Sequence, residues 1–235
     1  MQHLTRRAFV SAAAALGMAA GSTGAAEGQL VWKTGDWNPA TFQALVKHPA
    51  RVKQVYDVVK INEGMFLNNV KNSLNGLEFG FGVPRAEIKV VVAMHGPTNM
   101  LNYDDFIWNK YQIGEWLKVT DPETGKPAVR NIFAGKDMAA VAGAAAQDPD
   151  SEDSMYQGRN MATLRHRGVQ FLSCHTATEE QARALVRMRN LSQSPEELVK
   201  EMLAHTIEGT IVVASMVAAI ALLQSDGRFT YITVA

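Results

Sequence analysis

The apolar run from Ile88 to Met94 constrains the fold of this chain more than any other feature. Only Lys89 interrupts it, and a strand with apolar side chains on both faces is typical of a parallel sheet that helices cover on both sides. Segments 168–174 and 210–214 are further buried strands, and 52–59 and 229–234 are β-branched or alternating. The sequence therefore predicts a mainly parallel sheet of about five strands.

Helical patterns separate these strands. The segments with helical spacing of apolar residues, or with a helix-start signal, are 62–77, 106–117, 154–167, 176–188, 194–204 and 215–224. Thr176 followed by Glu179 fits a capping box, and Ser194 before Pro195 is a stronger start. An irregular lead-in covers 27–50, with at most a short helix near 40–47. The domain at 51–235 is predicted to be a three-layer α/β/α sandwich with an insert at about 97–153.

The first 26 residues resemble an export signal rather than part of the fold. Arg6 and Arg7 form a twin-arginine pair, an Ala-rich apolar run follows, and small residues lead to Ala26. The run is too short and too rich in alanine to span a bilayer well. We therefore predict a Tat-type signal over 1–26, a periplasmic mature protein, and no membrane attachment once the signal is removed.

Charge and motif content exclude several functional classes. Lys and Arg number 23, as do Asp and Glu, so there is no strong basic field and nucleic acid is not a predicted partner. No glycine-rich phosphate loop and no G-x-S-x-G elbow occur. We predict no cofactor.

Reactive side chains gather at one edge of the predicted sheet. His95 follows one strand, Cys174 and His175 end another, and Ser215 follows a third. Ligands of parallel sheets bind beyond the carboxyl ends of the strands, and the helix N-termini there favour thiolates, so the pKa of Cys174 is predicted to be lowered. The candidate catalytic residues are therefore Cys174, His175 and His95, whereas His205 is expected at the opposite edge.

Other interpretations of these residues stay open. Cys174 is the only cysteine, so in an oxidising compartment it is buried and inert, paired with another chain, or reactive. His95 fits a residue that hydrogen-bonds its own loop, and His175 fits an exposed loop position. A metal site built from Cys174, His175 and His95 is conceivable, but the spacing of metal-binding motifs is absent and no metal is predicted.

The chain resembles the DsrE/DsrF-like (YchN-like) family in three stretches that occur in order: 89–97, 168–174 and 211–232. The resemblance implies a compact α/β subunit that assembles into homo-oligomers, often trimers or hexamers, or into hetero-oligomers. In the sulfur-relay members, a cysteine at the end of the middle stretch carries sulfur as a persulfide, and Cys174 takes that position. His175 stands where a glycine is expected.

These observations lead to a functional hypothesis and two rivals. The hypothesis is a periplasmic, DsrE-like protein that carries sulfur on Cys174, with sulfurtransferase-like activity and a sulfur donor or acceptor protein as partner. His95 and His175 would tune the thiol or position an acceptor. The first rival is a non-catalytic module that holds a small ligand or metal beneath the segment with Trp108 and Trp116. The second is a structural oligomer with Cys174 buried.

Overall fold

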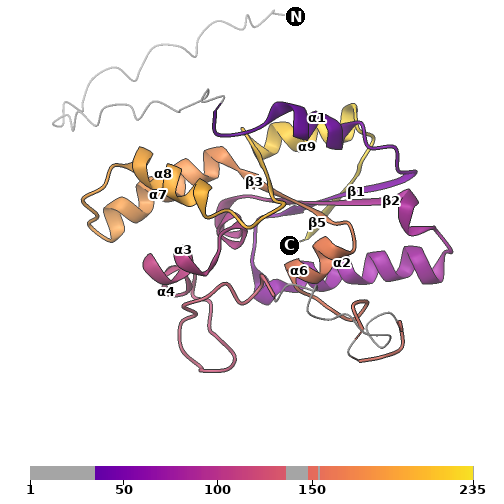
Figure 1. The fold of residues 1–235 in the computed structure, drawn as a ribbon, viewed down its shortest axis with the longest axis horizontal. Coiled ribbons are helices and arrows are strands. Elements are labelled where there is room, and N and C mark those ends of the chain that lie inside the picture. Colours follow the sequence, from indigo (N-terminus) through magenta and orange to yellow (C-terminus); the bar gives the residue numbers. More distant parts are fainter. Residues whose placement is uncertain (1–34, 136–147, 153, 235) are drawn as a thin grey trace, which may run out of the picture.

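The computed structural model describes residues 35–135, 148–152 and 154–234. It contains one sheet with strand order β4-β3-β2-β1-β5, in which every pairing is parallel (Figure 1). The strands are β1 Val52–Val58, β2 Ile88–Met94, β3 Gln170–Cys174, β4 Ile211–Val213 and β5 Thr230–Val234. The predicted strands and the predicted α/β class are confirmed. The predicted signal at 1–26, the start of the lead-in and residues 136–147 of the insert lie outside the described residues.

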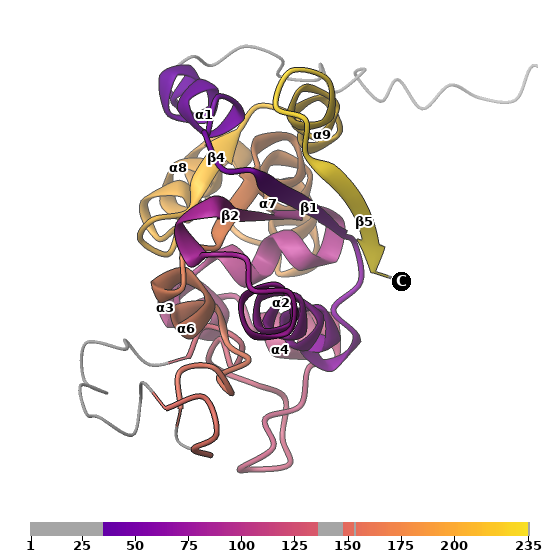
Figure 2. The ribbon, with the colours of Figure 1, turned by 90° about the vertical axis from the view of Figure 1, so that its right-hand side faces the viewer.

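Helices cover both faces of the sheet. They are α1 Pro39–Val46, α2 Met65–Asn75, α3 Asp105–Lys110, α4 Ile113–Leu117, α6 Met161–His166, α7 His175–Met188, α8 Pro195–Ala204 and α9 Met216–Ser225. Helices α1 and α9 enclose one core against Val55, Val91 and Leu172. Helices α2, α3 and α6 lie beyond the other face (Figure 2), and their side chains enclose the larger core together with those of α7 and α8.

The insert contributes to the larger core instead of lying outside it. It continues β2 through the 3₁₀ helix η4 Gly96–Asn102 and then through α3 and α4. Met100, Tyr103 and Trp108 are fully buried in this core, and the Trp108 indole N–H donates to the Met100 carbonyl at 3.0 Å. Trp108 is therefore a core residue and not the open roof of a ligand site. The single helix predicted over 106–117 is divided at Gln112, whose φ is 52°.

Two further predictions about helices are wrong. Only 161–166 of the predicted helix 154–167 is helical, because the Asn160 side chain caps it by accepting from Thr163 N at 2.9 Å. Helix α7 begins at His175, one residue before the predicted capping residue. Cys174 precedes it as the N-cap, and its Sγ accepts the Ala177 N–H.

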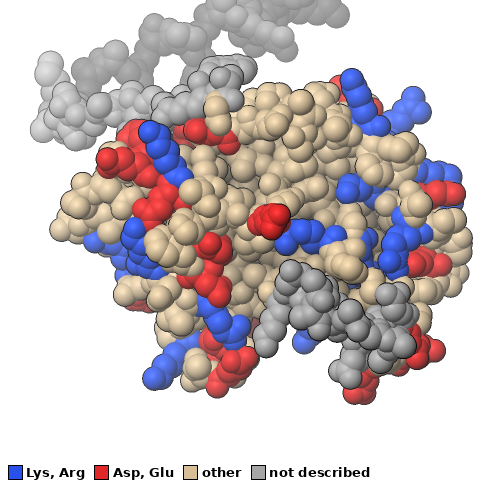
Figure 3. Space-filling view, viewed as in Figure 1, with Lys and Arg blue, Asp and Glu red and all other residues tan. Residues whose placement is uncertain are grey.

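The described surface carries charges of both signs without a large field of one sign on the face shown in Figure 3. This distribution agrees with the balanced composition. Within the described residues, no helix is long and apolar enough to cross a membrane.

The helix start predicted at Ser194 is confirmed, and it yields a stability test. Ser194 Oγ accepts Glu197 N at 3.2 Å, and Glu197 Oε2 accepts Ser194 N at 2.8 Å. Ser194→Ala removes one of these bonds and is expected to lower the free energy of unfolding by about 1 kcal/mol. Urea denaturation measures the change. Ser215→Ala is the matched control, because Ser215 is the N-cap of α9 without a side-chain cap bond. A Ser215→Ala loss as large as that of Ser194→Ala would contradict the expectation.

Candidate functional site

The candidate site lies where β1, β2 and β3 end, on the face that α9 covers. Side chains alternate along a strand, so Asp57, His95 and Cys174 share the face of the buried residues two positions before them, Val55, Ala93 and Leu172. Met94 pairs with Ser173, and His95, in extended conformation, takes the next position beside Cys174. The structure thus brings two of the three predicted residues to neighbouring strand ends.

The Cys174 sulfur lies between the N-termini of two helices. Its Sγ accepts the N–H of Ala177 in α7 at 3.5 Å and the N–H of Met216 in α9 at 3.3 Å. These donors favour a thiolate. Cys174 is only 5% exposed, however, and burial raises its pKa above the ordinary cysteine value, against the lowering effect of the two N–H groups. The predicted lowering of this pKa is therefore wrong, because the loss of hydration outweighs the helix termini.

A buried amide that the sequence analysis missed holds the backbone of Cys174. Asn99 of η4 accepts the Cys174 N–H at 2.8 Å and the Ser173 hydroxyl at 3.0 Å through Oδ1. Its Nδ2 donates to Gln181 Oε1 at 2.9 Å and to Thr178 Oγ1 at 3.2 Å, both in α7. Asn99 is fully buried. The insert, β3 and α7 therefore meet at one side chain, and the sequence signal for it is only an asparagine beside the apolar pair Met100 and Leu101.

Tyr103 extends this buried polar group on the side of the larger core. Its hydroxyl lies 2.6 Å from Thr178 Oγ1, and burial raises its pKa to about 12. Thr178 in turn donates to the Cys174 carbonyl at 3.0 Å. The phenol thus stays neutral at ordinary pH and acts as part of the scaffold beneath the strand end.

His175 does not share the environment of the thiol. It is the first residue of α7, and its ring nitrogens face two carboxylates: Nε2 lies 3.0 Å from Asp36 Oδ2, and Nδ1 lies 3.5 Å from Glu179 Oε1. Its side chain is 5% exposed. His175 therefore attaches the lead-in to the start of α7. The interpretation of His175 as an exposed loop residue is wrong.

His95 belongs to an open polar cluster across three strands. His95 Nε2 lies 2.7 Å from Asp57 Oδ1, and the Tyr231 hydroxyl donates to Asp57 Oδ2 at 2.6 Å. The bond to the Asp57 carboxylate is the main cause that raises the pKa of Tyr231. The sequence analysis missed Asp57 and Tyr231. The only sequence signal for Asp57 was an acidic residue near the end of a predicted strand.

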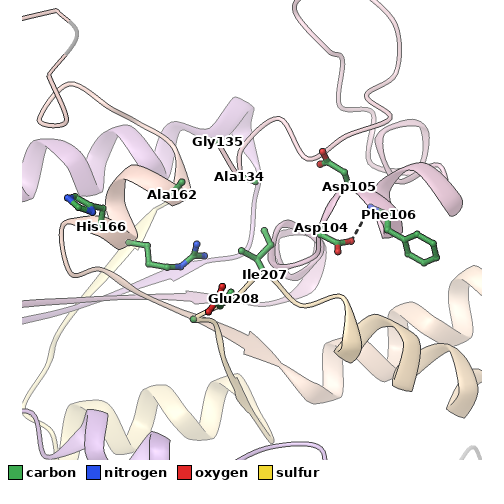
Figure 4. A pocket seen from close by; sticks show the side chains of 11 residues that line it. Asp104, Asp105, Phe106, Ala134, Gly135, Ala162, His166, Ile207 and Glu208 are labelled. Carbon is green, nitrogen blue, oxygen red and sulfur yellow. Dashed lines mark hydrogen bonds between the residues drawn. The ribbon is translucent and has the colours of Figure 1, made fainter. Parts of the chain in front are cut away.

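A hollow lies away from the thiol. A cavity of about 700 Å³ opens between the start of α3, the end of α6 and the loop before β4, with Asp104, Phe106, His166 and Glu208 on its walls (Figure 4). Asp104 Oδ2 lies 2.9 Å from Nδ1 of His205, and Phe106 stacks on the His205 ring. His205 therefore lies with this cavity and is not a partner of Cys174.

Within the described part of the chain, no group of three or more His, Cys, Asp or Glu side chains is arranged to hold a metal ion. Comparison with protein-family models, with curated proteins and with solved structures found no match. The resemblance to the DsrE/DsrF-like family stays a prediction from the stretches quoted above.

The Asn99 network generates a second stability prediction. Asn99→Ala leaves the buried N–H of Cys174 and the side chains of Ser173 and Gln181 without their partner. Each orphaned buried group costs about 1–3 kcal/mol, so the expected loss in the free energy of unfolding is about 3 kcal/mol or more. Urea denaturation with Asn109→Ala as control tests this, because Asn109 is exposed on α3. A loss for Asn99→Ala that matches the control would contradict the assignment.

Proposed function

We propose that the protein is exported to the periplasm and carries sulfane sulfur on Cys174. Sulfur carriage on this cysteine is what the resemblance to the sulfur-relay members of the DsrE/DsrF-like family implies. The observation that carries the proposal is the position of Sγ between the N–H groups of Ala177 and Met216, at 3.5 and 3.3 Å. Helix N-termini stabilise anionic sulfur. They would support both the attacking thiolate and the persulfide anion that forms from it.

The proposed loading step uses thiosulfate or polysulfide as the sulfur donor. The Cys174 thiolate attacks the terminal sulfur of the donor, and a new S–S bond forms at Sγ. The bond between that sulfur and the rest of the donor breaks, and sulfite or the shortened polysulfide leaves with the electron pair. No oxidant is required. Because Cys174 is 5% exposed, a small anionic donor fits this proposal better than a bulky one.

The burial of Cys174 also favours a rival function. A cysteine that is covered and protonated is common as an inert core residue, and the protein would then act as a structural oligomer. The two functions differ in the reactivity of the folded thiol. In either case we propose assembly into a homo-oligomer, or a hetero-oligomer with a sulfur donor or acceptor protein.

Sulfur loading measured by intact mass tests the proposed function. Folded protein incubated with thiosulfate, or separately with polysulfide, is expected to gain the mass of one sulfur atom, which dithiothreitol removes. Cys174→Ser removes the attacking sulfur and is expected to gain none. Unfolded wild-type protein treated with an alkylating reagent confirms that the thiol is intact.

Two results would overturn the sulfur-carrier proposal. One is the absence of any gain with both donors while the unfolded thiol alkylates fully, which favours the structural rival. The other is an equal gain by Cys174→Ser, which places the added sulfur elsewhere.

A further inference from the structure

The Asp57–His95–Tyr231 cluster fixes how His95 holds its proton. A carboxylate only accepts hydrogen bonds, so the neutral imidazole bonded to Asp57 Oδ1 at 2.7 Å carries its proton on Nε2. The lone pair of the ring is then on Nδ1. The Tyr231 hydroxyl occupies the other carboxylate oxygen at 2.6 Å, which holds Asp57 in place. A carboxylate that fixes the tautomer and orientation of a histidine is the usual support of a catalytic base.

His95 is reachable, in contrast to His175. The side chains of His95 and Asp57 are 22% and 19% exposed, and Tyr231 is 42% exposed. In the described part of the chain, Nδ1 of His95 makes no hydrogen bond. The cluster therefore offers an unoccupied proton acceptor at an accessible strand end.

The sheet places His95 and Cys174 at adjacent strand ends, because they follow the pair Met94 and Ser173 on neighbouring strands. General bases act within hydrogen-bond reach or through one water. Among the described residues no hydrogen bond joins the His95 ring to Sγ, whose partners are the N–H groups of α7 and α9, so proton transfer between them uses one intervening water. The covering elements bring few other charges, since α9 and η4 contain no titratable side chain. The Glu180 carboxylate acts on the thiol from α7.

We propose that His95, oriented by Asp57 and Tyr231, is the proton-transfer group of the Cys174 site. When the thiol attacks an electrophilic sulfur, its proton passes to His95 Nδ1. The new S–S bond forms at Sγ, and the bond from the attacked sulfur to its leaving group breaks. The leaving group departs with the electron pair, and the imidazolium later returns the proton to it or to solvent. Asp57 and Tyr231 are positioning residues. The inference deepens the proposed function and rests on it for the identity of the sulfur cargo.

Reaction of the folded protein with methyl methanethiosulfonate tests the inference without depending on sulfur loading. This small reagent transfers a methylthio group to a thiol and releases methanesulfinate. At about pH 7, His95→Gln is expected to slow the reaction by roughly 10- to 100-fold, the lower range of general-base effects. Burial raises the pKa of Cys174 above the ordinary cysteine value, so the thiol ionises without a base only at high pH. The ratio of the wild-type rate to the variant rate is therefore expected to fall towards 1 as the pH is raised to about 10.

Three variants separate proton transfer from structural effects. Asp57→Asn is expected to slow the reaction at about pH 7 and recover at about pH 10, as His95→Gln does, because the amide no longer fixes the tautomer. Tyr231→Phe is expected to act in the same direction and less strongly. His166→Gln is the control, since His166 is exposed near the distant cavity, and its rates are expected to equal those of the wild type. Urea denaturation confirms that each variant is folded.

The outcomes distinguish this inference from the proposed function. Any of three results would overturn the role of His95. His95→Gln could react at the wild-type rate at both pH values, it could be slowed equally at both, or the folded wild type could be unreactive. Sulfur loading without any dependence on His95 would overturn the inference alone. A pH-dependent effect of His95 without sulfur loading would support the inference and reject sulfur as the cargo.

Discussion

The hydrogen bond from the Cys174 N–H to Asn99 Oδ1, 2.8 Å long, is the contact on which the arrangement of the site depends. The β2–β3 ladder ends with Met94 and Ser173, so the next N–H of β3 needs a partner from elsewhere. A buried N–H without one is costly. Asn99 supplies it from the segment that continues β2, and the same amide bonds to α7. One side chain thus fixes the end of β3, the path of the insert and the start of the helix that donates to the thiol.

The strands could be predicted closely, because apolar or alternating runs have few alternatives to a buried strand. The insert could be predicted only in part. Helical spacing indicated the segment 106–117, where α3 and α4 lie. The 3₁₀ helix Gly96–Asn102 was missed, because it is too short to show a helical period. It packs against β2, β3 and α7, and a local pattern contains no record of that contact. The late start of α6 depends likewise on a side-chain cap at Asn160.

At the site too, some features could be predicted from the sequence and others could not. The predicted strand ends were enough to place Cys174 and His95 at one edge of the sheet, because the carboxyl ends of parallel strands lie at the same edge. Their partners depend on the strand order, which places β5 beside β1. Tyr231 and Asp57 meet although 174 positions separate them in sequence. The pKa of Cys174 depends on burial as well as on helix termini, and the sequence showed only the termini.

His95 and His175 both follow strands, but their surroundings differ. Both ring nitrogens of His175 face the carboxylates of Asp36 and Glu179, so this ring links the lead-in to α7. Among the residues that the structure describes, one nitrogen of His95 makes no hydrogen bond, and the ring lies at an accessible strand end. Helix N–H groups around Sγ hold a sulfur anion once it has formed, whereas burial opposes its formation from the thiol. Such a thiol needs a base to remove its proton, and this is the role that we propose for the oriented histidine on the adjacent strand.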